Sequence, residues 1–330
     1  MPRAPGIPRT ILVAPDSFKG TLSAAQVADA IGRGLSDRGR PVDLCPVADG
    51  GEGTLEALLP AVEGELRSAT VSDPLGRRIE ASFALGDGVA VVEMAAASGL
   101  GLVAPDERDA LAATTSGTGE LIMAALEAGA TTVYLGVGGS ATTDGGVGAV
   151  KAIRDAGGLG QARIVVLCDV RTPFEQAARV FAPQKGADAH TVTRLTKRLN
   201  DQARRFARDP RGVPMTGAAG GLSGGLWAEL GAELVPGAQF VLDAVDFDRR
   251  MRAARAVVTG EGKLDQQSLA GKLVSEISTR ARQAGVPCHA IVGTRELDSF
   301  GVRVLDLQAV LEAGTPRQIS AAARRLADVL

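Results

Sequence analysis

The chain has 330 residues, of which 45% are hydrophobic and 22% charged, a composition typical of a folded globular protein that buries a core. This length exceeds that of most single domains, so we expect two domains. The formal net charge of −2 provides no bulk attraction for nucleic acid or for an anionic membrane, and we expect a small-molecule ligand instead.

The three cysteines are far apart and form no CxxC pair, which favours reduced, buried thiols in a cytoplasmic protein. Residues 1–9 are rich in proline and lack the apolar core of a signal peptide, and no apolar run is long enough to span a membrane. With two histidines in the sequence, a multi-histidine zinc site is disfavoured. Any metal is expected to be Mg²⁺, held by carboxylates and substrate phosphates.

The first sixty residues contain two successive patterns of strand, polar loop and helix. Strands are predicted at 10–14 and 42–47, and Ser23 is placed to cap the first helix. Ligands collect at the carboxyl ends of strands in open α/β sheets, so the loops are candidate sites. The competing interpretation is that they hold only turn residues, a solvated lysine and helix-capping acids. The polar residues in question are Asp16, Ser17, Lys19, Asp49 and Glu52.

The pattern changes between residues 67 and 94. Short, partly alternating runs at 68–71, 78–85 and 89–93 are separated by turn sequences, which predicts antiparallel strands. We therefore place a domain boundary near residue 64. A helix is then expected at 116–127.

The most distinctive stretch is LGVGGSATTDGGVG at 135–148, which follows a predicted strand and precedes a predicted helix. Glycines let backbone N–H groups approach an anion, and the hydroxyls add donors, so the stretch favours a phosphate-binding loop. A glycine-rich turn that merely joins strand to helix is the alternative. The start formally fits GxGxxG/A, but 142–146 is a poor helix start, so the dinucleotide signal is weak.

A strand is predicted at 163–167 and a charged helix at 190–206, and a second glycine-rich segment follows at 217–225. That segment is either a ligand loop or a place where helices pack closely. In the last third of the chain, predicted strands and helices alternate again, as they do in the first sixty residues. The strands are predicted at 256–259, 288–292 and 302–305, and the helices at 273–284 and from about 317. Because the two chain ends resemble each other, we expect residues 1–64 and 240–330 to share one parallel sheet. Residues 65–239 would form an inserted, mixed α/β domain.

Carboxylates and lysines gather at loop tips beside glycines. The sequence contains no P-loop motif GxxxxGK[ST], so P-loop chemistry is poorly supported. Nucleophilic catalysis is also poorly supported, because histidine is scarce and the cysteines lack an obvious base. Phosphoryl transfer needs cradled phosphates, cations, carboxylates for Mg²⁺ and a carboxylate near the attacking hydroxyl. The residues fit a kinase better than a nicotinamide oxidoreductase of a small hydroxy acid, which stays open as an alternative.

Motifs in order from about residue 11 to 293 closely resemble those of the bacterial glycerate kinase family, type 1. They include APDSFKG at 14–20, ADGGEGT at 48–54, EMAAASGL at 93–100, GGSAT at 138–142, PQKGA at 183–187 and TGEGKLD at 259–265. The resemblance implies an ATP- and Mg²⁺-dependent kinase of D-glycerate, most often acting on the 2-hydroxyl. It also implies two α/β domains, one Rossmann-like, with the active site in the cleft between them.

We assign expected roles on this basis. The catalytic candidates are Asp49, Lys19 and Asp144. The candidates for glycerate are Asp16, Ser17 and Lys19, which offer a cation for its carboxylate and acceptors for its hydroxyls. The candidates for the nucleotide are Gly138, Gly139, Ser140, Thr142, Lys185 and Lys263. The candidates for Mg²⁺ are Asp169, Glu261 and Asp265. A homodimer is compatible with the sequence. Departures from the family pattern at Ser116, Thr143 and 171–174 leave open a non-catalytic relative that binds glycerate or nucleotide.

Overall fold

The computed structural model describes residues 9–330, which form two compact units. The first unit runs to Asp49 and resumes at Ala238–Leu330, and the second is Gly50–Gly237. The proline-rich start, for which no signal peptide is expected, lies outside the described residues as far as residue 8. Within residues 9–330, none of the helices combines the length and apolar character of a membrane span.

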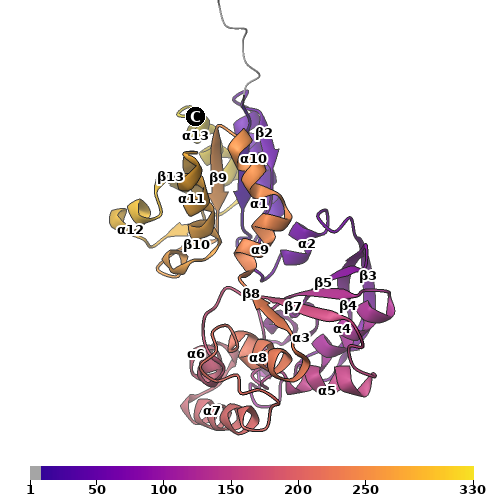
Figure 1. The fold of residues 1–330 in the computed structure, drawn as a ribbon. Helices are drawn as coiled ribbons and strands as arrows, with labels where there is room; N and C mark the ends of the chain where they lie inside the picture. The colour runs from indigo at the N-terminus through magenta and orange to yellow at the C-terminus, as the bar shows by residue number, and fades with distance from the viewer. Residues whose placement is uncertain (1–8) are drawn as a thin grey trace, which may run out of the picture. The chain divides into compact units, whose positions relative to one another are not determined.

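A parallel sheet built from both ends of the chain is the centre of the first unit (Figure 1). Every strand pairing in it is parallel, as predicted for the two chain ends. The strand order is β13 (Leu307–Glu312), β11 (Cys288–Val292), β9 (Ala256–Gly260), β1 (Ile11–Pro15) and β2 (Val42–Leu44).

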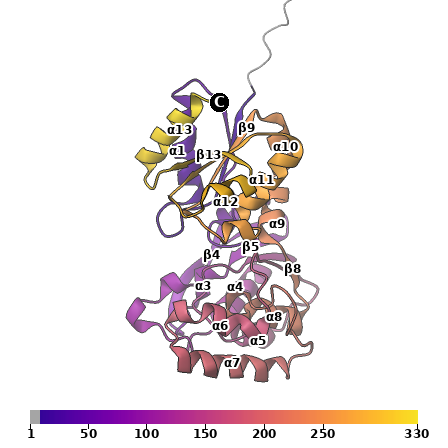
Figure 2. The same ribbon diagram turned by 90° about the vertical axis from the view of Figure 1, so that its left-hand side faces the viewer.

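Helices cover both faces of this sheet. Figure 2 shows α1 (Ala24–Ser36) and α13 (Pro316–Ala327) on one side and α10 (Phe247–Ala253) and α11 (Leu273–Ala284) on the other. The apolar faces of α1 and α13 pack with alternate residues of the strands into one buried cluster. Ser23 caps α1 as predicted, and Gln26 completes a capping box. The unit is therefore a sheet between two helical layers.

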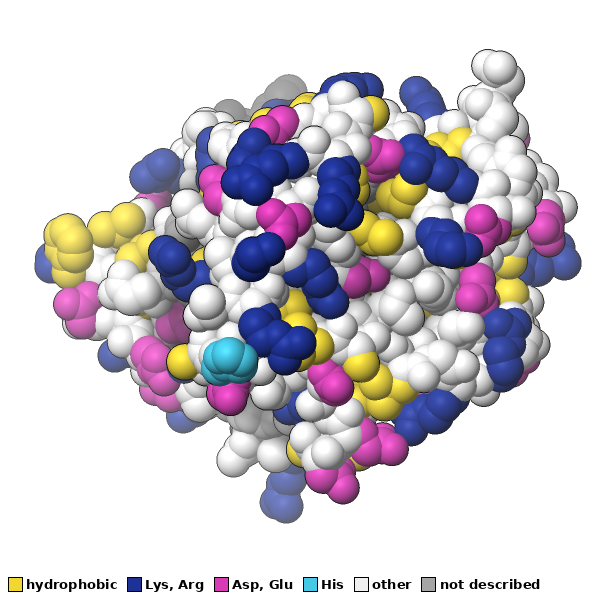
Figure 3. Space-filling model, turned by 90° about the horizontal axis from the view of Figure 1, so that it is seen from below, with side chains coloured by type: hydrophobic (Ala, Val, Ile, Leu, Met, Phe, Trp, Pro, Cys, Tyr) yellow, Lys and Arg dark blue, Asp and Glu magenta, His cyan; other side chains and the backbone are white. Residues whose placement is uncertain are grey.

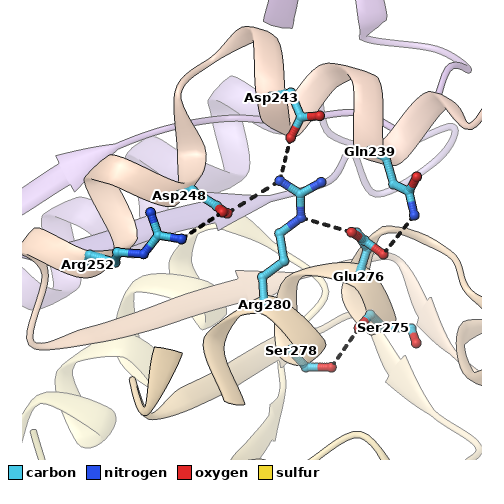
Figure 4. Close-up of polar contacts among 8 residues, drawn as sticks. All are labelled: Gln239, Asp243, Asp248, Arg252, Ser275, Glu276, Ser278 and Arg280. Carbon is cyan, nitrogen blue, oxygen red and sulfur yellow. Dashed lines mark hydrogen bonds and ion pairs between the residues drawn. The ribbon is translucent and has the colours of Figure 1, made fainter. Parts of the chain in front are cut away.

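One arginine joins three helices of the first unit (Figure 4). The guanidinium of Arg280 on α11 contacts Asp243 at 2.6 Å, Asp248 at 3.3 Å and Glu276 at 2.8 Å. Asp243 belongs to α9 (Gly237–Ala244) and Asp248 to α10. Arg280 thereby links α11 to α9 and α10, the first two helices after the chain returns to this unit.

The predicted strand at 302–305 is wrong, because these residues end the helix α12 (Ser299–Val304) and its C-cap. Asp298 begins that helix, since its Oδ1 accepts a hydrogen bond of 2.8 Å from the backbone N–H of Gly301. The true strand, β13, follows immediately. It lies at the sheet edge and is only partly buried, so its sequence lacks the continuous apolar run of an interior strand.

The second unit contains a mixed sheet, in agreement with the prediction. Its order is β3 (Glu65–Ser72), β4 (Arg78–Gly86), β5 (Val89–Glu93), β6 (Thr132–Gly136), β7 (Arg163–Leu167) and β8 (Glu233–Val235). The first three strands pair antiparallel and the others parallel. Helices α4 (Ser116–Glu127), α5 (Val147–Asp155) and α8 (Ala218–Leu230) contribute to a buried core cluster together with strands of this sheet.

Four further α-helices and two short strands belong to the described chain. They are α2 (Thr54–Leu58), α3 (Ala95–Ser98), α6 (Ala177–Phe181), α7 (Ala189–Ala203), β10 (Lys263–Leu264) and β12 (Thr294–Arg295). The units divide after Asp49, whereas the sequence placed the boundary near residue 64. The difference is α2, in which the N–H of Leu55 donates a 2.9 Å hydrogen bond to Glu93 of β5. A carboxylate of the second unit thus holds the positive end of this helix.

Candidate active site

A cavity of about 390 Å³ lies at the carboxyl ends of the parallel strands in the first unit. Asp16 follows β1, Glu261 follows β9 and Gly293 follows β11, while the loop after β2 supplies Asp49. This is where an open α/β sheet normally binds its ligand. The structure therefore gathers seven predicted site residues around one cavity: Asp16, Ser17, Lys19, Asp49, Glu261, Lys263 and Asp265.

Two carboxylates and a lysine share one part of the cavity lining. Asp16 is 5% exposed, and its pKa is raised well above the usual range, first by burial and then by the charge of Asp49. The Nζ of Lys19 donates to Oδ2 of Asp49 at 3.3 Å. The carboxylate of Asp49 raises the pKa of Lys19, which therefore remains a cation. This arrangement offers a positive charge beside a carboxylate that can accept a hydrogen bond.

Ser17 places a hydroxyl group in the lining of the cavity. Its backbone N–H donates to Oδ1 of Asp16 at 2.7 Å, which fixes the loop directly after β1. The Oγ is buried and has no hydrogen-bond partner among residues 9–330. Buried hydroxyls normally have a partner. The Ser17 hydroxyl is thus available to a bound polar molecule.

Glu261 accepts a hydrogen bond from Ser268, a buried serine seven residues later in the sequence. The Oγ of Ser268 donates to Oε1 of Glu261 at 2.6 Å and accepts from the N–H of Asp265 at 3.1 Å. Burial raises the pKa of Glu261 to about 7, against the opposing effect of the Ser268 hydrogen bond. Lys263 lies in the same loop, but its Nζ is paired with Glu296 at 2.9 Å. The Ser268 hydroxyl therefore contacts both acidic residues of this loop, the carboxylate of Glu261 and the backbone of Asp265.

The acids of this cavity fit Mg²⁺ only in part. The described chain contains no cluster of three or more His, Cys, Asp or Glu side chains arranged to enclose a metal. Mg²⁺ commonly uses one or two carboxylates and takes its other ligands from water and phosphate oxygens. Glu261 and Asp265 satisfy that requirement. Asp169, the third predicted ligand, follows β7 in the second unit and is half-buried.

In the second unit, the glycine-rich loop contacts the predicted lysine. The Nζ of Lys185 donates to Oγ of Ser140 at 2.8 Å and also to the carbonyl oxygen of Thr142. Lys185 is 1% exposed, and burial lowers its pKa to about 7. Three residues predicted to bind the nucleotide, Ser140, Thr142 and Lys185, therefore lie together. The lysine is buried beneath the loop and stabilises it through these hydrogen bonds.

Gly138 and Gly139 shape the start of the loop. A Cβ on Gly138 would lie 2.5 Å from the Cα of Gly51, and Gly139 has a φ of 72°. Side chains at these positions would therefore clash or strain the backbone. The second glycine-rich segment packs against the same loop, because a Cβ on Gly220 would lie 2.0 Å from the carbonyl oxygen of Thr142. The segment 217–225 therefore packs closely against the loop.

Asp144 is surrounded by donors. Its Oδ2 accepts from the N–H of Thr115 at 2.9 Å, from the Thr115 hydroxyl at 2.8 Å and from the N–H of Gly148 at 3.2 Å. Its Oδ1 accepts from the N–H of Gly146 at 3.0 Å. The carboxylate thus joins the N-termini of α4 and α5, where a negative charge is favourable. This geometry indicates a structural role more strongly than a catalytic one.

Sequence reasoning missed several lining residues of the first-unit cavity. Ser268 carries no motif, and its importance appears only when the turn brings it to Glu261. Gly293 is required where two chain segments meet, because a Cβ there would lie 2.4 Å from the carbonyl oxygen of Gly262. Lys272 precedes α11 and also lines the cavity. For Lys272, the Gly-Lys pair at 271–272 was the sequence feature that could have indicated a site residue.

Comparisons with known proteins agree on one family. The sequence profile described as the glycerate kinase family matches residues 11–156 and 154–328. The glycerate 2-kinase of Escherichia coli K12 is 40% identical over 331 aligned residues, which cover 88% of this chain and 87% of that protein. The glycerate kinase of Bacillus subtilis 168 is 40% identical over 334 residues, with coverage of 88% and 87%.

A solved structure extends the similarity to the whole fold. A crystal structure of a protein assigned as glycerate kinase 2 of Salmonella typhimurium LT2 superposes with a TM-score of 0.82. It is 34% identical to this chain, and the alignment covers 98% of both chains. From the profile, the relatives and the shared fold, we conclude that the chain belongs to the glycerate kinase family.

Proposed function

We propose that this protein transfers the γ-phosphoryl group of ATP to the 2-hydroxyl of D-glycerate, giving 2-phosphoglycerate and ADP. Membership of the glycerate kinase family supports the reaction class, and the name of the E. coli relative, glycerate 2-kinase, supports the position. The observation that carries the proposal is the cavity at the strand ends, where Asp16, Lys19 and Asp49 lie together.

The substrate roles follow from the charges in that cavity. The Lys19 ammonium would bind the glycerate carboxylate, and the unused Ser17 hydroxyl would bind one of its oxygens. Asp49 would accept the proton of the attacking hydroxyl. That oxygen forms a bond to the γ-phosphorus while the bond from phosphorus to the β,γ-bridging oxygen breaks, and ADP leaves. Asp16, whose pKa is raised, would hold a substrate hydroxyl in either protonation state.

The phosphates and the metal would use the remaining predicted residues. We assign Glu261, Asp265 and Asp169 to Mg²⁺, which supplies charge neutralisation on the phosphate oxygens when bound. Gly138, Gly139, Ser140 and Thr142 would provide the donors for the nucleotide phosphates. Because Lys185 is buried under this loop, we propose that it acts by holding Ser140 and Thr142 in place. Lys263 would exchange its ion pair with Glu296 for a phosphate.

An assay of ADP release over a panel of small hydroxy acids tests the proposal. We expect Mg²⁺-dependent ADP release with D-glycerate above all others, and a phosphorus NMR spectrum of the product that shows phosphate on the 2-oxygen. Phosphate on the 3-oxygen would correct the position alone. Binding of glycerate or ATP without ADP release would indicate a non-catalytic relative. NADH binding without Mg²⁺-dependent turnover would favour an oxidoreductase and overturn the proposal.

A further inference from the structure

A basic groove lies along α7 in the second unit. Figure 3 shows Lys and Arg side chains gathered on the face that includes this helix, which is seen from below. The groove is a cavity of about 450 Å³, and its lining residues all come from α7 and the turn that follows it. They are Arg194, Lys197, Arg198, Asp201, Gln202 and Arg205.

The positive charge of this groove is poorly balanced. Asp201 is its single acid, and it already pairs with Lys197 at 2.7 Å and with Arg204 at 3.1 Å. Within residues 9–330, the guanidinium groups of Arg194, Arg198 and Arg205 have no carboxylate at ion-pair distance. Burial lowers the pKa of Arg198, whereas the more remote charges of Asp144 and Asp109 raise it and the charge of Arg194 lowers it.

Two lining residues also hold the glycine-rich loop of this unit. Arg198 donates to the carbonyl oxygen of Thr143 at 2.6 Å, and Gln202 donates to the carbonyl oxygen of Asp144 at 3.1 Å. Arg198 also donates to the carbonyl oxygen of Leu111 at 2.9 Å. The same two side chains therefore line the basic groove and hold the loop.

We propose that this groove binds a small phosphorylated anion, and that the bound anion stabilises the loop at 142–146 through Arg198 and Gln202. Guanidinium groups recognise phosphate oxygens through paired, charge-assisted hydrogen bonds. A small anion fits the cavity volume, and the net charge of −2 disfavours a nucleic acid partner. The site goes beyond the proposed function, because it uses none of the residues assigned to glycerate, ATP or Mg²⁺.

Hydrogen exchange of the full chain with inorganic pyrophosphate, in the absence of Mg²⁺ and nucleotide, tests both parts of the inference. We expect pyrophosphate to slow exchange in peptides covering 140–146 and α7. The double variant Arg194→Gln/Arg205→Gln should raise the pyrophosphate concentration for half-maximal protection by roughly tenfold or more, because two charge-assisted contacts are lost. Arg204→Gln is the matched control, since Arg204 is the C-cap residue of α7 and does not line the groove.

The outcomes separate the groove from the active site. If pyrophosphate bound only at the proposed nucleotide loop, the double variant would keep full protection of 140–146, and the inference would be overturned. Protection of α7 without any effect on 140–146 would overturn the coupling. No protection in the unmodified chain at about 10 mM, well above typical cellular concentrations of such ligands, would overturn the site. Basal kinase activity of the double variant reports on the proposed function separately and should be unchanged without added anion.

Discussion

The ammonium group of Lys185 donates a hydrogen bond of 2.8 Å to the hydroxyl of Ser140 in the interior of the second unit. A second hydrogen bond goes to the carbonyl oxygen of Thr142. Burial lowers the pKa of Lys185 to about 7, and the negative charge of Asp144 opposes this effect only in part. The shape of the glycine-rich loop is therefore tied to a lysine that titrates near neutral pH.

The free energy of unfolding should depend on pH through this lysine. Its pKa is about 7 in the folded chain and near 10.5 when unfolded. Between these values the unfolded chain binds the proton that the folded chain has lost, so stability increases as pH rises from about 7 towards 10. We expect that Lys185→Met removes one to a few kcal/mol of this increase. Denaturant unfolding of both proteins at pH 6, 7, 8 and 9 measures it. Parallel pH profiles would contradict the assignment.

Arg280 should contribute more to stability than its surface neighbours. It is 15% exposed and contacts three carboxylates, whereas Arg252 is 64% exposed and contacts one. Arg280→Met leaves those acids without their shared cation, at an expected cost of roughly 1–3 kcal/mol. Arg252→Met is the matched control and should cost less than about 1 kcal/mol. Calorimetric unfolding compares the two, and equal effects would show that the three-helix link adds no stability.

The parallel sheet of the first unit could be predicted because its interior strands are short apolar runs that end in polar loops. The edge strand β13 could not, because partial burial allows polar residues such as Gln308 within it. The apolar run just before it, 302–305, satisfied the strand pattern instead, although Asp298 caps a helix there. The predicted boundary near residue 64 differs for a similar reason. Helix α2 has the same local pattern as α1, and tertiary contacts such as those of Leu55 with Glu93 and of Gly50 with Gly138 assign it to the second unit.

The site was predictable where chemistry and strand ends coincide. Asp16, Asp49 and Glu261 each follow a strand of one parallel sheet, and topology then brings them to a single cavity. Residues that position predicted site residues by hydrogen bonds could not be identified in this way. Ser268 is marked by no pattern, and the burial of Lys185 depends on how distant segments of the second unit pack around the loop.

Asp49 and Asp144 should give opposite phenotypes when changed to asparagine. Asp49→Asn removes the proposed proton acceptor, so turnover should fall roughly 10²- to 10⁴-fold. Its stability should change little, because the loss of the Lys19 contact is offset by removal of a negative charge beside Asp16. Steady-state kinetics and calorimetry on the same preparation measure both quantities. Near-normal turnover would remove Asp49 from the mechanism.

Asp144→Asn instead places an amide among donors that require an acceptor, including the Thr115 and Gly148 N–H groups. We expect a loss of roughly 2–4 kcal/mol of stability, because several buried donors lose a charged partner. Under conditions where the variant stays folded, turnover should fall much less than in Asp49→Asn. A stable Asp144→Asn protein with turnover reduced as far as in Asp49→Asn would restore Asp144 as a catalytic residue.

Ser268 should influence metal binding through Glu261. Carboxylates that bind metals are usually oriented by a hydrogen bond, and loss of such a partner commonly weakens binding 10- to 100-fold. Ser268→Ala removes the 2.6 Å hydrogen bond to Glu261, so we expect the Mg²⁺ concentration for half-maximal activity to rise by about tenfold or more, with a smaller change in the KM for glycerate. Titration of the ATP complex with Mn²⁺, followed by electron paramagnetic resonance, measures the affinity without turnover. Ser299→Ala, at an exposed serine of the same unit, should leave both values unchanged. If Ser268→Ala raised the KM for glycerate while Mn²⁺ affinity stayed the same, Glu261 would belong to the substrate site and the metal would depend on other acids.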